Sequence, residues 1–518
     1  MHLHKYFLFL ISIVVICSCE PPVVKDKTVE KIASLYDESK KPFYHGVASG
    51  DPLSDRVIIW TRYTPEEKGK SHPVKWIIAK DKALTEVVNE GIATAYPDRD
   101  YTIKIDVLGL EANEYYYFQF IENGRKSALG RTKTAPRRNA EKVKLAVISC
   151  TNYEAGYYNA LASLAKQDSM DAVIHLGDYI YEYEPGGYGA EELDRHHLPA
   201  KELISLEDYR TRYAQYRLDE DFQEVHRMHP FIAIWDDHEI ANNAYAQGAQ
   251  NHQTDEGDYL KRKQSAKQAY YEWLPIREKS GGQLYRKITM GKLADILLLD
   301  ERIAGRTAPA ENPKDKIFMD EERTMLGAQQ YEWLTKSLSS SEARWKIIGS
   351  QVLFSDLDQK AGRPKRPVNM DAWDGYPAEK KRFVQFLKEY QIEDLVFVSG
   401  DTHCSWAFEV PTSAAAYRKG GTKETVAIEL GTPSVTSANY DEYAEVDQIE
   451  KLEGVYKKEN AHLKYVNLRD HGYLLLEISE EEVLATYRYV ETVLAKTEKE
   501  IIGEHITIKS GNKVIELK

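Results

Sequence analysis

The stretch that decides the fold is DAVIHLGDYIYEY at residues 171–183. It starts as a continuous apolar run and ends in a Gly-Asp turn with three tyrosines after it. A continuous apolar run is typical of a strand that is buried on both faces of a sheet. Because open α/β sheets bind ligands outside the carboxyl ends of their strands, Asp178 is expected at a functional site.

Other stretches repeat this pattern of an apolar run that ends in polar side chains. They are LAVISC (145–150), FIAIWDDHE (231–239), ADILLLDER (294–302), RWKIIGSQ (344–351) and DLVFVSGDTHCS (394–405). Strands that deliver Asp, Asn, His and Cys to one edge of a sheet build a site there. These runs, with helix-like stretches such as residues 152–167 between them, predict an α/β domain over residues 139–518.

The region before this domain has a different rhythm. Short β-rich runs such as TIKIDV and YYYFQF alternate apolar and polar residues between turn signals. They predict an all-β sandwich over residues 41–138. A length of 518 residues agrees with more than one domain.

The N-terminus predicts export. Residues 1–19 have a short basic start and an apolar stretch from Tyr6 to Ile16, which is short for a membrane span and suits a signal peptide. The end, Ile16-Cys17-Ser18-Cys19, resembles the lipobox of bacterial lipoproteins, with Cys19 as the lipidated residue. An ordinary cleaved signal is the alternative. Residues 20–40 are polar and predict a tether with some helix.

The net charge argues against nucleic acid as a binding partner. The formal charge is −13, whereas nucleic-acid binding depends on an excess of Lys and Arg. A phosphorylated substrate is still possible if metals or cations lie in the site itself.

Each polar strand end has a structural explanation of its own. A Gly-Asp pair can be a turn, Asp236 to Glu239 can be the acidic start of a helix, and Cys150 can be a small buried apolar residue. Their recurrence in one domain favours a metal site instead. Carboxylate and amide oxygens suit Ca²⁺, Mg²⁺ or Mn²⁺, while thiolate, phenolate and imidazole suit a transition metal.

The order of these motifs resembles the PhoD-like alkaline phosphatases of the metallophosphoesterase superfamily. The resemblance covers roughly residues 43–440. It includes HGVASGDPLSDRVIIWTR (45–62), SC (149–150), GDYIYEY (177–183), WDDHE with NN (235–243), AYYEWLPIR (269–277), DAWDGYP (371–377), GDTHCS (400–405) and GTPSVTS (431–437). It implies a metallophosphoesterase-type sandwich of two mixed sheets flanked by helices, preceded by a small all-β domain of immunoglobulin or fibronectin type.

The resemblance also implies a mixed site with one Fe³⁺ and one or two Ca²⁺ ions. The implied iron ligands are Cys150, Asp178, Tyr181 and His403, and a thiolate with a phenolate would stabilise a ferric ion. Asp178 would bridge to calcium, which Asp237, Asn242 and Asp401 would hold. Asn243 is the alternative to Asn242.

The implied activity is hydrolysis of phosphomonoesters and phosphodiesters by a metal-bound hydroxide. His238, expected in a helix just after its strand, is the candidate for phosphate contact or general acid. Arg302 and Arg306 are candidate phosphate clamps or else ordinary ion-pair arginines. The preferred ester stays open, and a monomer is expected.

Three features qualify the resemblance. The N-terminus lacks the Arg-Arg pair with which many family members are exported. Gln351 lies where related dimetal enzymes often have a histidine ligand, and an amide oxygen suits calcium better. If Cys150 is a ligand, then Cys404 should be free and buried rather than in a disulfide.

Two other functions compete with this one. An iron–zinc or iron–manganese enzyme of the purple acid phosphatase kind would have Asp and His where this chain has Cys150 and Asn152. A surface-anchored binding protein with an inactive phosphatase domain would have no reason to keep the full set of candidate ligands.

Overall fold

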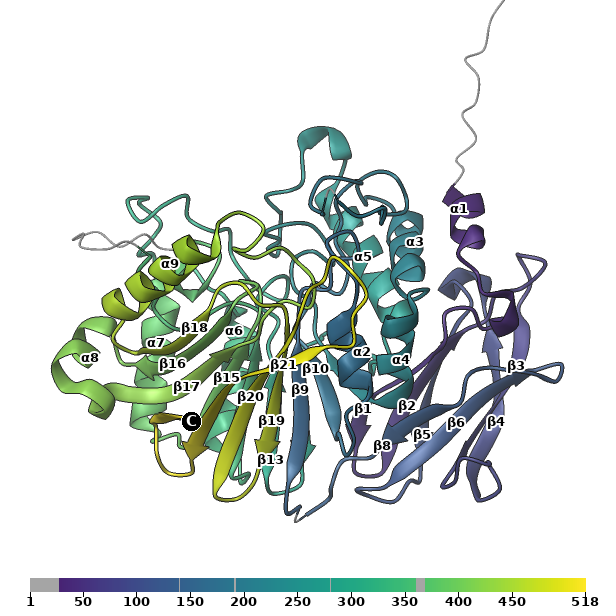
Figure 1. Cartoon of the computed structure of the whole chain (residues 1–518), viewed down its shortest axis with the longest axis horizontal. Helices are drawn as coiled ribbons and strands as arrows, with labels where there is room; N and C mark the ends of the chain where they lie inside the picture. The colour runs from purple at the N-terminus through teal and green to yellow at the C-terminus, as the bar shows by residue number, and fades with distance from the viewer. Residues whose placement is uncertain (1–27, 139, 191, 280, 360–368) are drawn as a thin grey trace, which may run out of the picture.

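The computed structural model describes residues 28–138, 140–190, 192–279, 281–359 and 369–518. The strands in these ranges form three sheets, and helices lie against them in a mixed α/β fold (Figure 1). The predicted signal peptide, with Cys19, lies outside the described residues. The domain boundaries given above stay predictions.

The largest sheet has ten strands and carries three of the strands that the sequence pattern predicts. Strands β9, β10, β11 and β1 run parallel at its centre. Its order is β22 (Ile515–Leu517), β21 (Glu500–Lys509), β20 (Glu482–Val490), β19 (Gly472–Ile478), β9 (Val143–Ile148), β10 (Ala172–His175), β11 (Pro230–Ala233), β1 (Val47–Leu53), β2 (Arg56–Arg62) and β5 (Thr102–Leu108).

A second sheet of seven strands contains the other predicted buried strands. Strands β13, β14, β15 and β17 are parallel. The order is β12 (Arg286–Met290), β13 (Ala294–Leu298), β14 (Trp345–Ser350), β15 (Leu395–Ser399), β17 (Thr425–Gly431), β16 (Ser405–Pro411) and β18 (Leu463–Asn467). One hydrophobic core joins the two sheets, because it includes Val147 and Ile174 from the first with Ile347 and Val396 from the second.

The third sheet belongs to the N-terminal region. Its order is β4 (Val87–Ala95), β3 (His72–Ala79), β6 (Tyr115–Glu122) and β7 (Arg125–Lys126), with β8 (Gly130–Lys133) paired to β6. It packs on β2 and β5 through a core of its own that includes Val57, Trp76 and Phe118. The N-terminal strands are therefore divided between this small sheet and the ten-stranded sheet.

Helix α4 contacts α2 and β1, and α3 contacts α5, whereas α7, α8 and α9 lie with the seven-stranded sheet and contact β17, β16 and β18 (Figure 1). The bounds are α1 (Thr28–Ser34), α2 (Asn159–Ala165), α3 (Leu206–Tyr216), α4 (Glu220–Met228), α5 (Tyr259–Trp273), α6 (Gly327–Ser339), α7 (Pro377–Glu389), α8 (Ala414–Gly420) and α9 (Val446–Glu459). Short 3-10 helices are η1 (Glu38–Lys40), η2 (Pro97–Arg99), η3 (Thr254–Glu256), η4 (Trp373–Gly375) and η5 (Gly421–Glu424). Within the described ranges, no helix has the length and apolarity that crossing a membrane requires.

Two local predictions differ from the structure. The segment that carries His238 is a turn rather than a helix. Ile240 and Ala241 both donate their N–H groups to the Asp237 carbonyl, but the residues that follow do not continue a helix. The predicted helix over residues 152–167 is confined to α2, and just before it Tyr158 is buried in the core with Tyr153 packed against the same core.

Candidate metal centre

The predicted ligands meet where the two larger sheets come together. The loops that follow β9, β10 and β11 carry Cys150, Asp178 and Asp237, and the loop after β15 of the other sheet carries Asp401 and His403. The site therefore lies between the carboxyl ends of two sheets, not along one edge as the strand pattern alone suggested. The reason is that β15 belongs to the second sheet.

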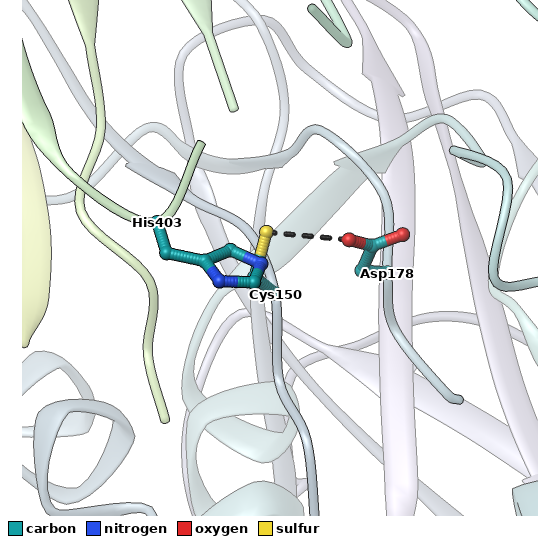
Figure 2. Close-up of side chains that lie close together, drawn as sticks. All are labelled: Cys150, Asp178 and His403. Atoms are coloured by element: carbon teal, nitrogen blue, oxygen red, sulfur yellow. Dashed lines mark hydrogen bonds between the residues drawn. The ribbon is translucent and has the colours of Figure 1, made fainter. Parts of the chain in front are cut away.

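In each of three groups of side chains, the possible ligand atoms lie within 4.8 Å of one another, and shared residues link the groups into a row. The first is Cys150, Asp178 and His403, which Figure 2 shows. The second is Asp178, Asp237 and His238, and the third is Asp236, Asp237 and Asp401. Asp178 and Asp237 each belong to two groups, so the three groups form one continuous centre.

The Cys150 end of the centre is buried and closely packed. The Cys150 thiol donates to Asp178 Oδ2 at 3.4 Å (Figure 2), and the Tyr181 hydroxyl reaches the same oxygen at 3.2 Å. All three side chains are buried. Tyr181 therefore lies with Cys150 and Asp178, as the resemblance implied, whereas Tyr179 bonds to His226 outside this centre.

A backbone carbonyl orients the imidazole of His403. Nδ1 of His403 lies 2.7 Å from the Ala438 carbonyl oxygen, which can only accept. Nδ1 therefore carries the proton, and Nε2 is left as the lone-pair nitrogen of the ring. This is the tautomer that a metal ligand needs.

The backbone is strained at four of the predicted ligands. The φ angles are 59° at Cys150, 54° at Asp178, 63° at Asp401 and 63° at His403. Residues with a Cβ rarely adopt this left-handed region, which costs roughly 1–2 kcal/mol per residue. Such strain persists at functional sites because the surrounding structure holds it.

Gly177 allows the loops after β10 and β11 to approach each other. Its φ is 113°, and a Cβ at this position would lie 2.3 Å from the Asp236 nitrogen. A residue with a side chain cannot occupy this position without moving one of the loops. The Gly-Asp pair is thus both a turn and a close contact.

The buried negative groups perturb each other. Burial, followed by the neighbouring charge of Asp178, raises the pKa of Cys150 and that of Tyr181 well above their usual ranges. Burial also raises the pKa of Asp178 strongly and that of Asp401 to about 7. Burial lowers the pKa of His403 to about 4, so this imidazole is neutral at pH 7.

Arg302 lies under the carboxylates and is fully buried. Its Nη2 donates to Asp401 Oδ1 at 3.0 Å and its Nη1 to Asp371 Oδ2 at 2.6 Å, while Nε contacts Asp236. Arg306 binds the other oxygen of Asp371 at 2.6 Å. Both arginines are therefore counter-ions of aspartates, of which Asp236 is buried and Asp371 and Asp401 are partly exposed.

His238 is paired with Glu182, a residue that the sequence pattern did not single out. Its Nδ1 lies 2.7 Å from Glu182 Oε2, and both side chains are buried. Burial lowers the pKa of His238, but Glu182, Asp237 and Asp178 outweigh it and raise that pKa well above its usual value. Burial alone would raise the pKa of Glu182, yet His238 and two further donors bring it to about 2.

The amide candidates differ in their surroundings. The Asn242 N–H donates to Glu182 at 2.6 Å, and the Asn243 N–H donates to Asp237 at 2.5 Å. These contacts leave the choice between the two side chains open. Gln351 uses both ends of its amide on backbone groups, with Glu301 N–H at 3.0 Å and the Leu299 carbonyl at 2.7 Å.

The donor set fits cations. The Oδ1 atom of Asp178 is buried without a hydrogen-bond partner among the described residues, which is costly unless a cation binds it. The first group offers a thiolate and an imidazole, with the Tyr181 phenol beside them, and these suit a transition metal. The third offers carboxylates, which suit a hard cation. Cys150 and Cys404 are both free and buried, so the prediction for Cys404 is confirmed.

Several residues that shape the centre were not predicted from the sequence. Glu239 accepts the backbone N–H groups of Asp178 at 3.1 Å, Tyr179 at 2.6 Å and Asp236 at 2.8 Å, and so ties two ligand loops together. Others in this class are Glu182, Asp236, Asp371 and Ser437. All lie inside motifs quoted above, so their place in those motifs, rather than their residue type, was the feature that could have identified them.

Comparisons with known proteins agree with these motifs. A family model described as PhoD-like phosphatase matches residues 145–487, and one described as PhoD-like phosphatase, N-terminal domain, matches residues 30–136. The chain is 37% identical over 475 residues to alkaline phosphatase D of Bacillus subtilis (strain 168), covering 88% of this chain and 79% of that protein. The solved structure of PhoD aligns with a TM-score of 0.83 at 33% identity, covering 93% of this chain and 92% of that one.

Proposed function

The chain belongs to the PhoD-like phosphatase family and is a phosphoesterase, and on this premise we propose an exported enzyme with a mixed iron and calcium site that hydrolyses phosphomonoesters and phosphodiesters. The observation that carries this proposal is the chain of three ligand groups linked through Asp178 and Asp237. A single-metal site would need only one such group.

The first and third ligand groups differ in chemistry, and this difference supports two kinds of metal. We assign Cys150, Asp178, Tyr181 and His403 to Fe³⁺, because anionic sulfur and phenol oxygen stabilise a ferric ion. Asp237, Asn242 and Asp401 are assigned to Ca²⁺, with Asp178 as the bridge, because calcium prefers oxygen ligands.

Bound cations supply neutralisation of the phosphate charge and activation of water for attack on phosphorus. The residues of the chain supply the remaining chemistry. The Nδ1 proton of His238 is held by Glu182, so in the imidazolium the second proton lies on Nε2. We propose that His238 gives this proton to the departing alcohol oxygen, or contacts the phosphate through it.

Arg302 is proposed to contact the substrate phosphate with its planar fork. All of its side-chain nitrogens are bound to aspartates, so this role requires Arg302 to exchange one of them for phosphate. We place this exchange at Asp401, because cation binding to that carboxylate would compete with the 3.0 Å contact from Nη2. Arg306 keeps both Asp371 and the Tyr376 hydroxyl, which supports an ion-pair role.

We further propose that the protein is a monomer anchored by lipid at Cys19, with residues 20–40 as a tether. The anchor would hold it in the bacterial periplasm or at the cell surface. The two larger sheets with their shared core support a metallophosphoesterase-type sandwich over residues 139–518. The small sheet with its separate core supports a β-rich domain over residues 41–138.

The test uses protein that lacks residues 1–19. Iron and calcium are measured by elemental analysis, and hydrolysis of a chromogenic phosphomonoester and diester is followed before and after calcium chelation. We expect iron and calcium in the protein, and activity that falls on chelation and returns with Ca²⁺. Activity that survives the loss of both metals would refute the mixed site. Mass spectrometry of the mature N-terminus tests the lipid, and an unmodified Cys19 would refute the anchor.

A further inference from the structure

The motif GTPSVTS, residues 431–437, has no role in the function proposed so far, yet it runs across the metal centre. With Ala438 it forms a segment that we call the strap. The Val435 N–H donates to the Ser149 carbonyl at 3.0 Å, and the Ser434 N–H donates to the His403 carbonyl at 3.2 Å. The strap therefore binds the backbone next to Cys150 and at His403, and these two proposed ligands follow strands of different sheets.

One side chain of the strap reaches a proposed metal ligand directly. The Ser437 hydroxyl lies 2.6 Å from the Tyr181 phenol oxygen and 3.0 Å from the Cys150 carbonyl oxygen. Ser437 is completely buried, so water does not compete for this contact. The shorter of the two distances is the one to Tyr181.

The neighbouring residues hold Ser437 in this position. The Ser434 hydroxyl donates to the Ser437 carbonyl at 2.6 Å, and His471 Nδ1 lies 2.9 Å from the same hydroxyl. The backbone N–H of Ser437 bonds to the Cys150 carbonyl at 3.3 Å. Ser437 is thus fixed through its N–H and its carbonyl while its side chain faces Tyr181.

Resting on the proposed iron site, we propose that Ser437 is a positioning residue of the metal centre that donates a hydrogen bond to the Tyr181 phenolate. In the structure the Tyr181 hydroxyl gives its one proton to Asp178, so Ser437 is the donor in the 2.6 Å contact. An ionised phenol can only accept, so metal binding would keep this direction. Hydrogen bonds to an ionised group are short and strong, and partners that hold metal ligands in this way govern metal affinity.

The bond has an electronic consequence that a purely structural contact lacks. A donor to the phenolate oxygen draws electron density from it and lowers the energy of its filled orbitals. Without that donor, transfer of charge from phenolate to a ferric ion needs less energy. The visible absorption of the metal-loaded protein should then move to longer wavelength.

The test compares Ser437→Ala with a matched control, Thr436→Val. The Thr436 hydroxyl is equally buried and lies in the same strap, but it donates to the Asn152 carbonyl at 2.8 Å and not to Tyr181. Each protein is stripped of metal, reloaded with Fe³⁺ from its citrate complex, and titrated with a competing chelator. We expect Ser437→Ala to bind iron about 10-fold more weakly, with its band shifted to longer wavelength. Thr436→Val should match the unsubstituted protein in both readouts.

A double-mutant cycle keeps the inference falsifiable if Ser437→Ala also loosens the fold. In a Tyr181→Phe background the phenol oxygen is gone, so adding Ser437→Ala should weaken metal binding no further. If Ser437→Ala weakens metal binding equally in both backgrounds, or if Thr436→Val shifts the band as much as Ser437→Ala does, the role of Ser437 is refuted. The proposed iron site would still stand in that case. Failure of the unsubstituted protein to bind any transition metal would overturn the proposed iron site and this inference together.

Discussion

Replacement of Glu182 by glutamine is expected to move the alkaline limb of the pH–rate profile to lower pH. His238 acts as an acid only while it is protonated, so activity falls as the pH rises through its pKa. Glu182 is a main cause of the raised His238 pKa, and a glutamine at this position removes the charge. The glutamine amide would donate to Nδ1 and so stabilise the neutral imidazole.

The size of the shift follows from the contact. The imidazole and the carboxylate are 2.7 Å apart and buried. A hydrogen bond to a charged group contributes about 1.5–3 kcal/mol. Since one pKa unit corresponds to about 1.4 kcal/mol, the limb should move down by about 1–2 pH units.

The assay is the pH dependence of kcat/KM with two esters. An alkyl phosphate has a leaving group that needs a proton, whereas nitrophenolate leaves without one. The shift should appear with the alkyl ester and be absent with the nitrophenyl ester. His238→Gln should slow the alkyl ester by about 10²–10⁴-fold. An alkaline limb that stays in place in a folded, metal-loaded Glu182→Gln variant would refute the assignment of His238 as the acid.

Further predictions concern stability and metal dependence. Gly177→Ala should lower the free energy of unfolding by about 3 kcal/mol in urea denaturation, because its Cβ meets Asp236 and its φ is 113°. Glu239→Ala should cost about 3 kcal/mol or more in the same assay, since three buried N–H groups lose their acceptor; a cost below that of one hydrogen bond would contradict this. The Glu182–His238 pair should stabilise the metal-free fold fully between pH 4.5 and 6.5, which are the pKa values of Glu and His in the unfolded chain. Its contribution should fade as the pH drops toward 2, the folded pKa of Glu182, or rises past the raised pKa of His238. Added Ca²⁺ should raise the melting temperature and a chelator should lower it, because the cation binds the folded carboxylates.

The sequence was most informative where a buried strand ends. Apolar runs marked the ends of β9, β10, β11 and β15, and the structure brings Cys150, Asp178 and Asp237 together with Asp401 and His403. The sequence did not predict which strands share a sheet, because strand pairing depends on contacts between residues far apart in the chain. For the same reason the sequence indicated two arginines after β13 but not that aspartates from three other segments surround Arg302.

The turn at His238 shows a second limit. An Asp-Asp-His-Glu run has the acidic composition of a helix start, but Glu239 instead accepts N–H groups from Asp178 in the loop after β10 and from Asp236 in its own loop. Left-handed backbone at Cys150 and Asp178 was equally unforeseeable. Neither residue type favours a positive φ over the alternatives enough to predict it from one sequence.

The pairing of β1 with β11 has a consequence for how the chain is made. Ser49 and Gly50 align with Pro230 and Phe231, so a strand synthesised early waits for a partner about 180 residues later. Until then, β1 has an unpaired edge that invites association with other chains. Conversely, a fragment that starts after residue 138 would leave the β11 edge open beside the metal centre. Pairing with β1 therefore protects the β11 edge from aggregation, and residues 139–518 are best expressed together with the N-terminal segment.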